Sequence, residues 1–282
     1  MNRNIETFLG CAREYDESRV AVFGAPYDST TSFRPGARFG PHAARSESFG
    51  LETFSPYQNR DLTEVPVFDG GDLELSFGPP EPALAAVGEM TGRIMADGKL
   101  PVMIGGEHLL TLGAVRAAAR LHPGLAIIHF DAHADLRDEY LGQTLSHATV
   151  MRRAWELLGD GRIHQFGIRS GDGLEFAWGA DHIITHRFDF QGLEELIDSL
   201  GRRPVYFSLD LDVLDPAYFP GTGTPEPGGV TFTELLNAVL TVGRLNLVGC
   251  DLMELCPVYD PSGRSTAAAA KILRELIIAA AT

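Results

Sequence analysis

The sequence predicts an α/β fold in which helices cover both faces of a mostly parallel β-sheet. Short apolar runs alternate with helical patterns along the chain, as in proteins built from βα units. The run LAIIHF at residues 125–130 is almost continuously apolar, which is expected of a strand buried on both faces. Polar motifs directly follow several of these runs, at the strand ends where α/β folds place their sites.

Eight segments have the short, apolar, β-rich composition of buried strands. In chain order they are VAVFG at 20–24, VPVF at 65–68, PVMI at 101–104, AIIHF at 126–130, IHQFGI at 163–168, HIIT at 182–185, VYFSL at 205–209 and LNLVGC at 245–250. Helical patterns lie between and after them, at residues 81–97, 109–121, 147–158, 192–200, 233–242 and 265–281. Periodicity alone does not distinguish an open three-layer sheet from an eight-stranded barrel.

Length and composition favour one intracellular domain spanning residues 1–282, because 44% hydrophobic residues can form a large core. The first twenty residues contain no apolar signal region, and no apolar run is long enough to span a membrane. Three cysteines, Cys11, Cys250 and Cys256, do not suggest a disulfide framework. We therefore expect a cytoplasmic protein with no membrane partner.

The net charge of −15 argues against nucleic acid as a partner, because nucleic-acid binding depends on basic patches. A cationic small molecule is favoured instead. Acidic composition is weak support by itself, since a negative surface often serves only solubility.

Two short stretches predict a metal site. Asp131, His133 and Asp135 follow one expected strand, and Asp210 and Asp212 lie at the end of another. Four carboxylates cannot converge without cations, because two unit charges about 4 Å apart repel by roughly 4 kcal/mol at an effective dielectric near 20. Along an extended strand Asp131 and Asp135 would lie about 13 Å apart. The chain must therefore curl after Asp131, or several ions must bind, or both.

We favour two ions, bridged by carboxylates such as those of the DxD pair. Oxygen-rich coordination with a minority of imidazole nitrogen favours Mn²⁺ over structural Zn²⁺. Alone, either motif would equally suit a strand-end cap or a turn, but both follow strands, as does GGEH at 105–108. His129 lies within an apolar strand and is expected to be a core residue. The Pro- and Gly-rich stretch 218–229, which contains Thr222, is either an active-site loop or a surface turn.

Together the motifs resemble the ureohydrolase (arginase/agmatinase) family, and within it the agmatinases most closely. The resemblance runs from about residue 20 to the C-terminus. It is carried by GAPYDSTTSFRPGARFGP at 24–41, GGEH at 105–108, FDAHAD at 130–135, SHATVM at 146–151, SLDLDVLDP at 208–216 and DLME at 251–254.

This resemblance implies a three-layer αβα sandwich with an eight-stranded, mostly parallel sheet and two Mn²⁺ per chain. It implies that one ion is bound by His108 and Asp135, the other by His133 and Asp212, and both by Asp131 and Asp210. In the family, a hydroxide bridging the two ions attacks the guanidinium carbon. Asp135 then stabilises the intermediate and moves its proton, His147 shuttles a proton, and Glu254 holds the guanidinium group.

The expected substrate is agmatine, hydrolysed to putrescine and urea. The loop at residues 136–145 carries Asp138 and Glu139, which would attract the free ammonium of agmatine, and Thr222 is a further expected contact. Arg137 would instead suit a guanidino acid, and all three charges of this loop could also face solvent. Alternatives are a guanidinobutyrase, an arginase, a formiminoglutamase or a non-catalytic binding homologue. The resemblance also implies a homo-oligomer, either a trimer or a hexamer.

Overall fold

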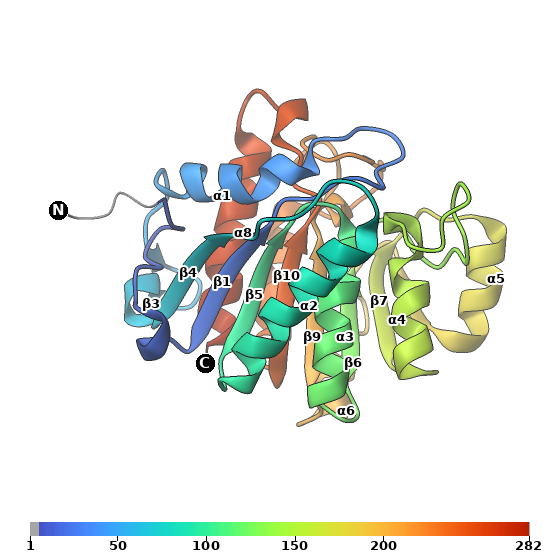
Figure 1. Cartoon of the computed structure of the whole chain (residues 1–282), viewed down its shortest axis with the longest axis horizontal. Helices are drawn as coiled ribbons and strands as arrows, with labels where there is room; N and C mark the ends of the chain where they lie inside the picture. Colours follow the sequence, from blue (N-terminus) through green and yellow to red (C-terminus); the bar gives the residue numbers. More distant parts are fainter. Residues whose placement is uncertain (1–5, 282) are drawn as a thin grey trace.

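The computed structural model, which describes residues 6–281, contains an open sheet of eight parallel strands between two layers of helices (Figure 1). The strand order is β4-β1-β5-β10-β9-β6-β7-β8, and every pairing in it is parallel. Two free edges, β4 and β8, show that the sheet is not a barrel. The strands are β1 (Val20–Ala25), β4 (Val67–Asp72), β5 (Leu100–Gly105), β6 (Ala126–Phe130), β7 (Ile163–Ile168), β8 (Ile184–Arg187), β9 (Val205–Asp210) and β10 (Leu247–Met253).

The helices form two layers because the central strands bury apolar side chains on both faces. In β1, for example, Val20 and Val22 face one core, whereas Ala21 and Phe23 face the other. The second core is closed by α2 (Pro80–Ala96), α3 (Thr111–Leu121), α4 (Val150–Leu158) and α5 (Gly173–His182). The first core is closed by α1 (Gly40–Ser48), α6 (Leu193–Leu200), α7 (Phe232–Val242) and α8 (Arg264–Ala280).

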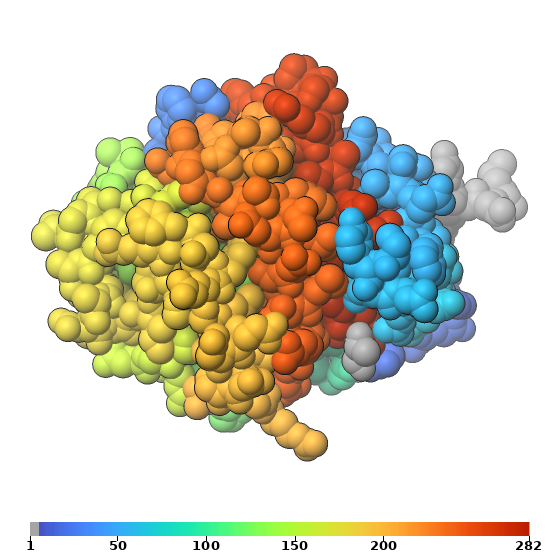
Figure 2. Space-filling model, turned by 180° about the vertical axis from the view of Figure 1, so that it is seen from behind, coloured from blue at the N-terminus to red at the C-terminus, as the bar shows by residue number. Residues whose placement is uncertain are grey.

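Seen from behind, most of the surface belongs to the C-terminal half of the chain (Figure 2). A small hairpin of β2 (Phe54–Ser55) and β3 (Arg60–Asp61) lies outside the main sheet. Within residues 6–281, no helix has the length and apolar character needed to cross a membrane.

All eight expected strands are present, but two helices were not expected. Helix α1 follows a Gly- and Pro-rich motif whose turn-forming residues masked the helix. Helix α5 contains two glycines and begins at a capping box formed by Asp172 and Glu175. The strand expected at 182–185 begins only at Ile184, because His182 is the last residue of α5.

Candidate metal centre and active site

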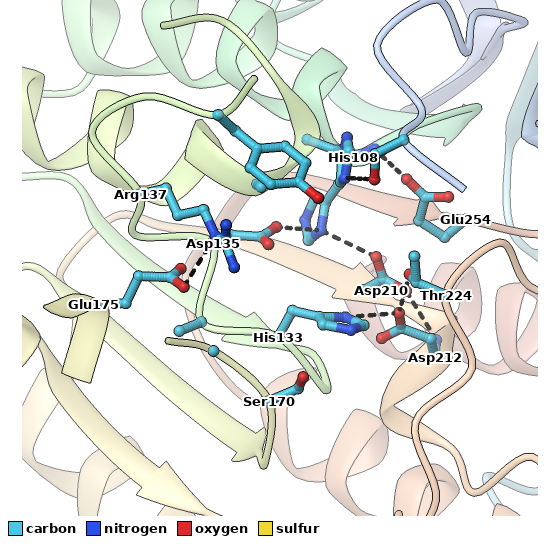
Figure 3. Close-up of a pocket in the computed structure, with 16 residues that line it drawn as sticks. His108, His133, Asp135, Arg137, Ser170, Glu175, Asp210, Asp212, Thr224 and Glu254 are labelled. Atoms are coloured by element: carbon cyan, nitrogen blue, oxygen red, sulfur yellow. Dashed lines mark hydrogen bonds and ion pairs between the residues drawn. The ribbon is translucent and has the colours of Figure 1, made fainter. Parts of the chain in front are cut away.

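The four central strands of the sheet carry the expected site residues at their carboxyl ends (Figure 3). His108 lies in the short 3-10 helix that follows β5, and Asp131 directly follows β6. Asp210 is the last residue of β9, and Glu254 directly follows β10. Since β5, β10, β9 and β6 are neighbours, these side chains meet at one edge of the sheet.

His108 presents one ring nitrogen to a group of carboxylates. Its Nδ1 lies 3.0 Å from Asp131 Oδ2, 3.1 Å from Asp210 Oδ2 and 3.5 Å from Asp135 Oδ2. This buried nitrogen has no hydrogen-bond partner among residues 6–281, while Nε2 lies 2.9 Å from Ser208 Oγ. A lone pair aimed at three carboxylates fits a divalent cation, with the other ring nitrogen bonded as in many metal-binding histidines.

A second imidazole shares one of these carboxylates. His133 Nδ1 lies 3.0 Å from Asp212 Oδ2 and 3.4 Å from Asp131 Oδ1. The two oxygens of Asp131 therefore face different histidines, Oδ2 toward His108 and Oδ1 toward His133. Two candidate ion positions that share Asp131 are consistent with this geometry.

The backbone curls after Asp131, as the spacing of the motif requires. Asp135 has the left-handed φ of 53°, and its carbonyl accepts hydrogen bonds from the N–H groups of Met151 and Arg152 at 3.1 and 3.2 Å. Glu254 is also left-handed, with φ 62°. Non-glycine residues in this region carry strain, on the order of 1–3 kcal/mol. Of the five non-glycine residues with positive φ in the described part of the chain, two therefore face the cavity.

Burial dominates the electrostatics of the acidic groups. It raises the pKa of Asp210 well above its usual value, and the charges of Asp212 and Asp131 raise it further. Burial likewise raises the pKa of Asp135 and Glu254. For Asp131, burial is outweighed by the neighbouring histidines, which lower its pKa well below the usual range. Bound cations would favour the ionised form of every one of these carboxyl groups.

His129 is a core residue, as expected, and it supports Asp131. The Gln165 amide nitrogen lies 3.0 Å from His129 Nδ1 and also donates to the Ala134 carbonyl at 2.7 Å. With Nδ1 accepting from Gln165, Nε2 carries the proton and donates to Asp131 Oδ2 at 2.8 Å. His129 thus orients a carboxylate of the candidate metal centre.

A cavity of about 230 Å³ lies over these groups. His147 and Glu254 line it, together with five residues of the candidate metal centre, His108, His133, Asp135, Asp210 and Asp212. Glu254 Oε1 accepts the backbone N–H of His108 at 2.7 Å. Burial lowers the pKa of His147 to about 4, and the neighbouring His133 and His108 add to this effect. The His147 ring is therefore neutral near pH 7.

The other expected substrate contacts do not line this cavity. Asp138 and Glu139 are exposed and line an adjoining depression, which shares Arg137 and Glu175 with the cavity, and Asp138 pairs there with Arg153. Thr222 is fully buried, and its hydroxyl has no hydrogen-bond partner among the described residues. Its neighbour Thr224 lines the cavity instead and donates to Asp212 Oδ2 at 3.3 Å. Substrate contacts of Asp138, Glu139 and Thr222 remain predictions.

Glu175 is a cavity residue that sequence reasoning missed. Its carboxylate accepts from the Leu136 N–H at 3.0 Å, from the Asp172 N–H at 2.8 Å and from Arg137 Nε at 3.2 Å. Arg137 and Tyr140 line the same cavity. The capping-box pattern of Asp172 and Glu175 was visible in the sequence, and it could have located both this helix and this carboxylate.

Comparison with known proteins extends the match over almost the whole chain. The arginase family model matches residues 18–279. An agmatinase of Bacillus subtilis (strain 168) is 45% identical over 277 residues, covering 97% of this chain and 96% of that protein. A guanidinobutyrase of Pseudomonas aeruginosa is 33% identical over 282 residues, covering 94% of this chain and 87% of that protein.

Comparison with solved structures points to the same family. The crystal structure of the agmatine ureohydrolase of Thermoplasma volcanium superposes with a TM-score of 0.90 at 36% identity, covering 98% of this chain and 94% of that one. The matched residues include all four strand ends at which the candidate metal centre is built. The chain therefore belongs to the arginase family and is a hydrolase that acts on amidino carbon–nitrogen bonds.

Proposed function

We propose that the protein hydrolyses agmatine to putrescine and urea with two Mn²⁺ ions. The observation that carries this proposal is the Asp131 carboxylate, whose two oxygens face two imidazoles beneath one acidic cavity. The proposed ligands are His108 and Asp135 for one ion, His133 and Asp212 for the other, and Asp131 and Asp210 for both.

The donor set fits hard divalent cations. Four carboxylates and two imidazoles converge, and His108 Nδ1 lacks a hydrogen-bond partner among residues 6–281. Oxygen-rich coordination of this kind suits Mn²⁺. When bound, two such ions supply hydroxide near neutral pH for attack on the guanidinium carbon.

Residues around the cavity would bind the guanidinium group and handle its protons. Glu254 offers a buried carboxylate that suits the planar N–H donors of a guanidinium group. Asp135 is placed to accept a proton at its carboxylate. His147 would accept a proton at Nε2 and pass it on to the departing amine, since its Nδ1 already donates to the Thr30 carbonyl at 3.0 Å. Cleavage of the C–N bond then releases a protonated amine and urea.

The remote ammonium of agmatine is better matched by Glu175 than by the exposed Asp138 and Glu139. Glu175 is buried and lines the same cavity as Glu254. The similarity to agmatinases and the net charge of −15 also favour a dicationic substrate.

A guanidino acid is the second candidate, because Arg137 lines the cavity and a related protein is a guanidinobutyrase. Arg137 is already paired with Glu175, which offsets its charge. A substrate carboxylate would have to compete with Glu175 for Arg137, just as the agmatine ammonium would have to compete with Arg137 for Glu175.

Urea release with Mn²⁺ tests these assignments. The substrates are agmatine, arginine, 4-guanidinobutyrate and formiminoglutamate, and we expect the highest kcat/KM for agmatine. Preference for 4-guanidinobutyrate or arginine would refute the substrate. Urea release by His108→Ala and Asp210→Ala at the wild-type rate would refute the site. Asp198→Ala, which removes an exposed carboxylate on α6, is the matched control and should retain activity.

A trimeric or hexameric assembly and a cytoplasmic location are further proposals. Light scattering of the purified chain measures the first, and fractionation of cells measures the second.

A further inference from the structure

We infer that Glu107 is a positioning residue for His147 and acts through Thr30. Glu107 lies between Gly106 and His108 but points away from the metal centre, toward the loop that follows β1. The inference rests on the proposed function insofar as His147 takes part in the reaction. The contacts themselves do not depend on which guanidino compound is the substrate.

Glu107 holds Thr30 through two hydrogen bonds. One carboxylate oxygen accepts the Thr30 backbone N–H at 2.7 Å, and the other accepts the Thr30 hydroxyl at 2.6 Å. Glu107 is fully buried, and no ion pair forms on its carboxylate among residues 6–281. A buried carboxylate without a countercharge is costly, and here the Thr30 donors supply its hydrogen bonds.

Thr30 in turn contacts His147 at two points. The Thr30 hydroxyl oxygen accepts the His147 backbone N–H at 3.2 Å, and His147 Nδ1 lies 3.0 Å from the Thr30 carbonyl oxygen. A carbonyl can only accept, so Nδ1 carries the proton and Nε2 keeps its lone pair. Nε2 lies 3.3 Å from Ser32 Oγ, at the edge of the cavity.

Backbone hydrogen bonds hold Glu107 in place beside the loop that contains Thr30. Gly106 N donates to the Ala25 carbonyl at 2.9 Å, and Glu107 N donates to the Tyr27 carbonyl at 2.8 Å. A Cβ on Gly106 would lie 2.0 Å from the Tyr27 oxygen, so only glycine permits this close approach. One short motif therefore sets both a proposed metal ligand, His108, and the loop that orients His147.

Kinetics of the Mn²⁺-loaded chain test this inference. Glu107→Gln replaces the acceptor facing Thr30 with an amide, and Thr30→Ala removes the hydroxyl. For both variants we expect kcat to fall roughly 10- to 100-fold, with KM and the Mn²⁺ content unchanged. Thr30→Ser keeps the hydroxyl and should restore kcat. Wild-type kcat in both Glu107→Gln and Thr30→Ala would overturn the inference, as would loss of Mn²⁺, which would place the defect at His108.

Asp260→Asn is the matched control. Asp260 is buried, and one of its carboxylate oxygens accepts the backbone N–H and the hydroxyl of Ser265 at 2.8 and 2.5 Å. The other oxygen accepts the same two groups of Ser262 at 3.2 and 2.5 Å. Neither Asp260 nor Glu107 lines the cavity, but Asp260 holds serines, whereas Glu107 holds the threonine that contacts His147. We expect a wild-type kcat. If kcat of Asp260→Asn fell as much as kcat of Glu107→Gln, the loss would not be specific to Glu107, and the inference would be overturned.

A double-mutant cycle separates positioning from a direct role. If Glu107 acts only through His147, Glu107→Gln should cause no further loss of kcat in the His147→Asn background. Independent, multiplicative losses would overturn the inference.

Histidine ¹⁵N NMR of the full chain with diamagnetic Mg²⁺ supplies a readout that needs no substrate. We expect the neutral Nδ1–H tautomer of His147 in the wild type and a mixture of tautomers in Glu107→Gln. Identical spectra would overturn the inference. A wild-type enzyme that released no urea from any guanidino substrate would instead refute the proposed function, and the NMR comparison would still stand.

Discussion

Two acidic residues of the cavity adopt a backbone conformation that most side chains avoid. Asp135 has φ 53° and Glu254 has φ 62°. Asp and Asn tolerate this region better than Ala does. We expect both Asp135→Asn and Asp135→Ala to lose at least about 100-fold in kcat. In metal-free denaturant titrations the Ala variant should be less stable than the Asn variant by about 1 kcal/mol. Equal stabilities would show that the conformation stores no strain.

Burial of His164 should make the free energy of unfolding decrease at acidic pH. Burial lowers its pKa from 6.5 to about 4, with smaller effects from His186 and Arg203, and neither ring nitrogen has a partner among residues 6–281. Between pH 6.5 and about 4, the unfolded chain therefore binds a proton at His164 that the folded chain does not bind. The free energy of unfolding should therefore decrease as the pH falls from 6.5 to about 4. His164→Leu should lose less stability across it, measured as the urea midpoint against pH. An unchanged difference between pH 7 and pH 4 would contradict the assignment.

At the scale of elements, the first turn of helix α5 (Gly173–His182) contributes a residue that both caps the helix and lines the cavity. Glu175 completes the capping box at its first turn and also accepts from Arg137 and the Leu136 backbone. Glu175→Gln keeps an acceptor oxygen at this position of the capping box, so the helix cap should be largely preserved. The substitution should raise KM for agmatine about tenfold, the loss of one charge-assisted contact, with kcat less affected. A KM equal to that of the wild type would exclude Glu175 as the contact for the remote ammonium.

The strands could be predicted because their signal is local. Each expected segment is a short run without charged residues, and for the inner strands burial on both faces explains this composition. The clustering of Asp131, His133 and Asp135 at one edge of the sheet could also be predicted, since they follow one such run. The direction of Asp138 could not be predicted, because this side chain pairs with Arg153 from α4 (Val150–Leu158). Helix α5 was missed because its glycines weaken the helical pattern.

At the scale of the whole molecule, strand order is the property that the sequence left open. An open sheet and a closed barrel share the same βα alternation, and only the pairing of distant segments separates them. Strand β10, near the C-terminus, pairs with β5 and β9, which places Glu254 beside His108. The candidate metal centre thus joins strands from both halves of the chain, so metal bound there should affect global unfolding.

Mn²⁺ should therefore stabilise the entire fold, and the acidic cluster should destabilise it when metal is removed. At a metal concentration about 100 times Kd, binding adds about 2.7 kcal/mol to the free energy of unfolding. Without metal, burial and the charges of Asp212 and Asp131 disfavour the ionised form of Asp210, so its pKa is raised. A folded-state pKa above the unfolded value means that the folded chain binds the extra proton, so metal-free stability should rise as pH falls from neutral.

Asp210→Asn removes this charge, and the metal-free variant should be more stable than metal-free wild type, on the order of 1 kcal/mol, while gaining less from Mn²⁺. Calorimetric unfolding with chelator and with Mn²⁺, at two pH values, measures both effects. A metal-free Asp210→Asn variant that unfolds at a lower temperature than metal-free wild type would show that the hydrogen bonds of Asp210 stabilise the fold more than its charge repulsion destabilises it.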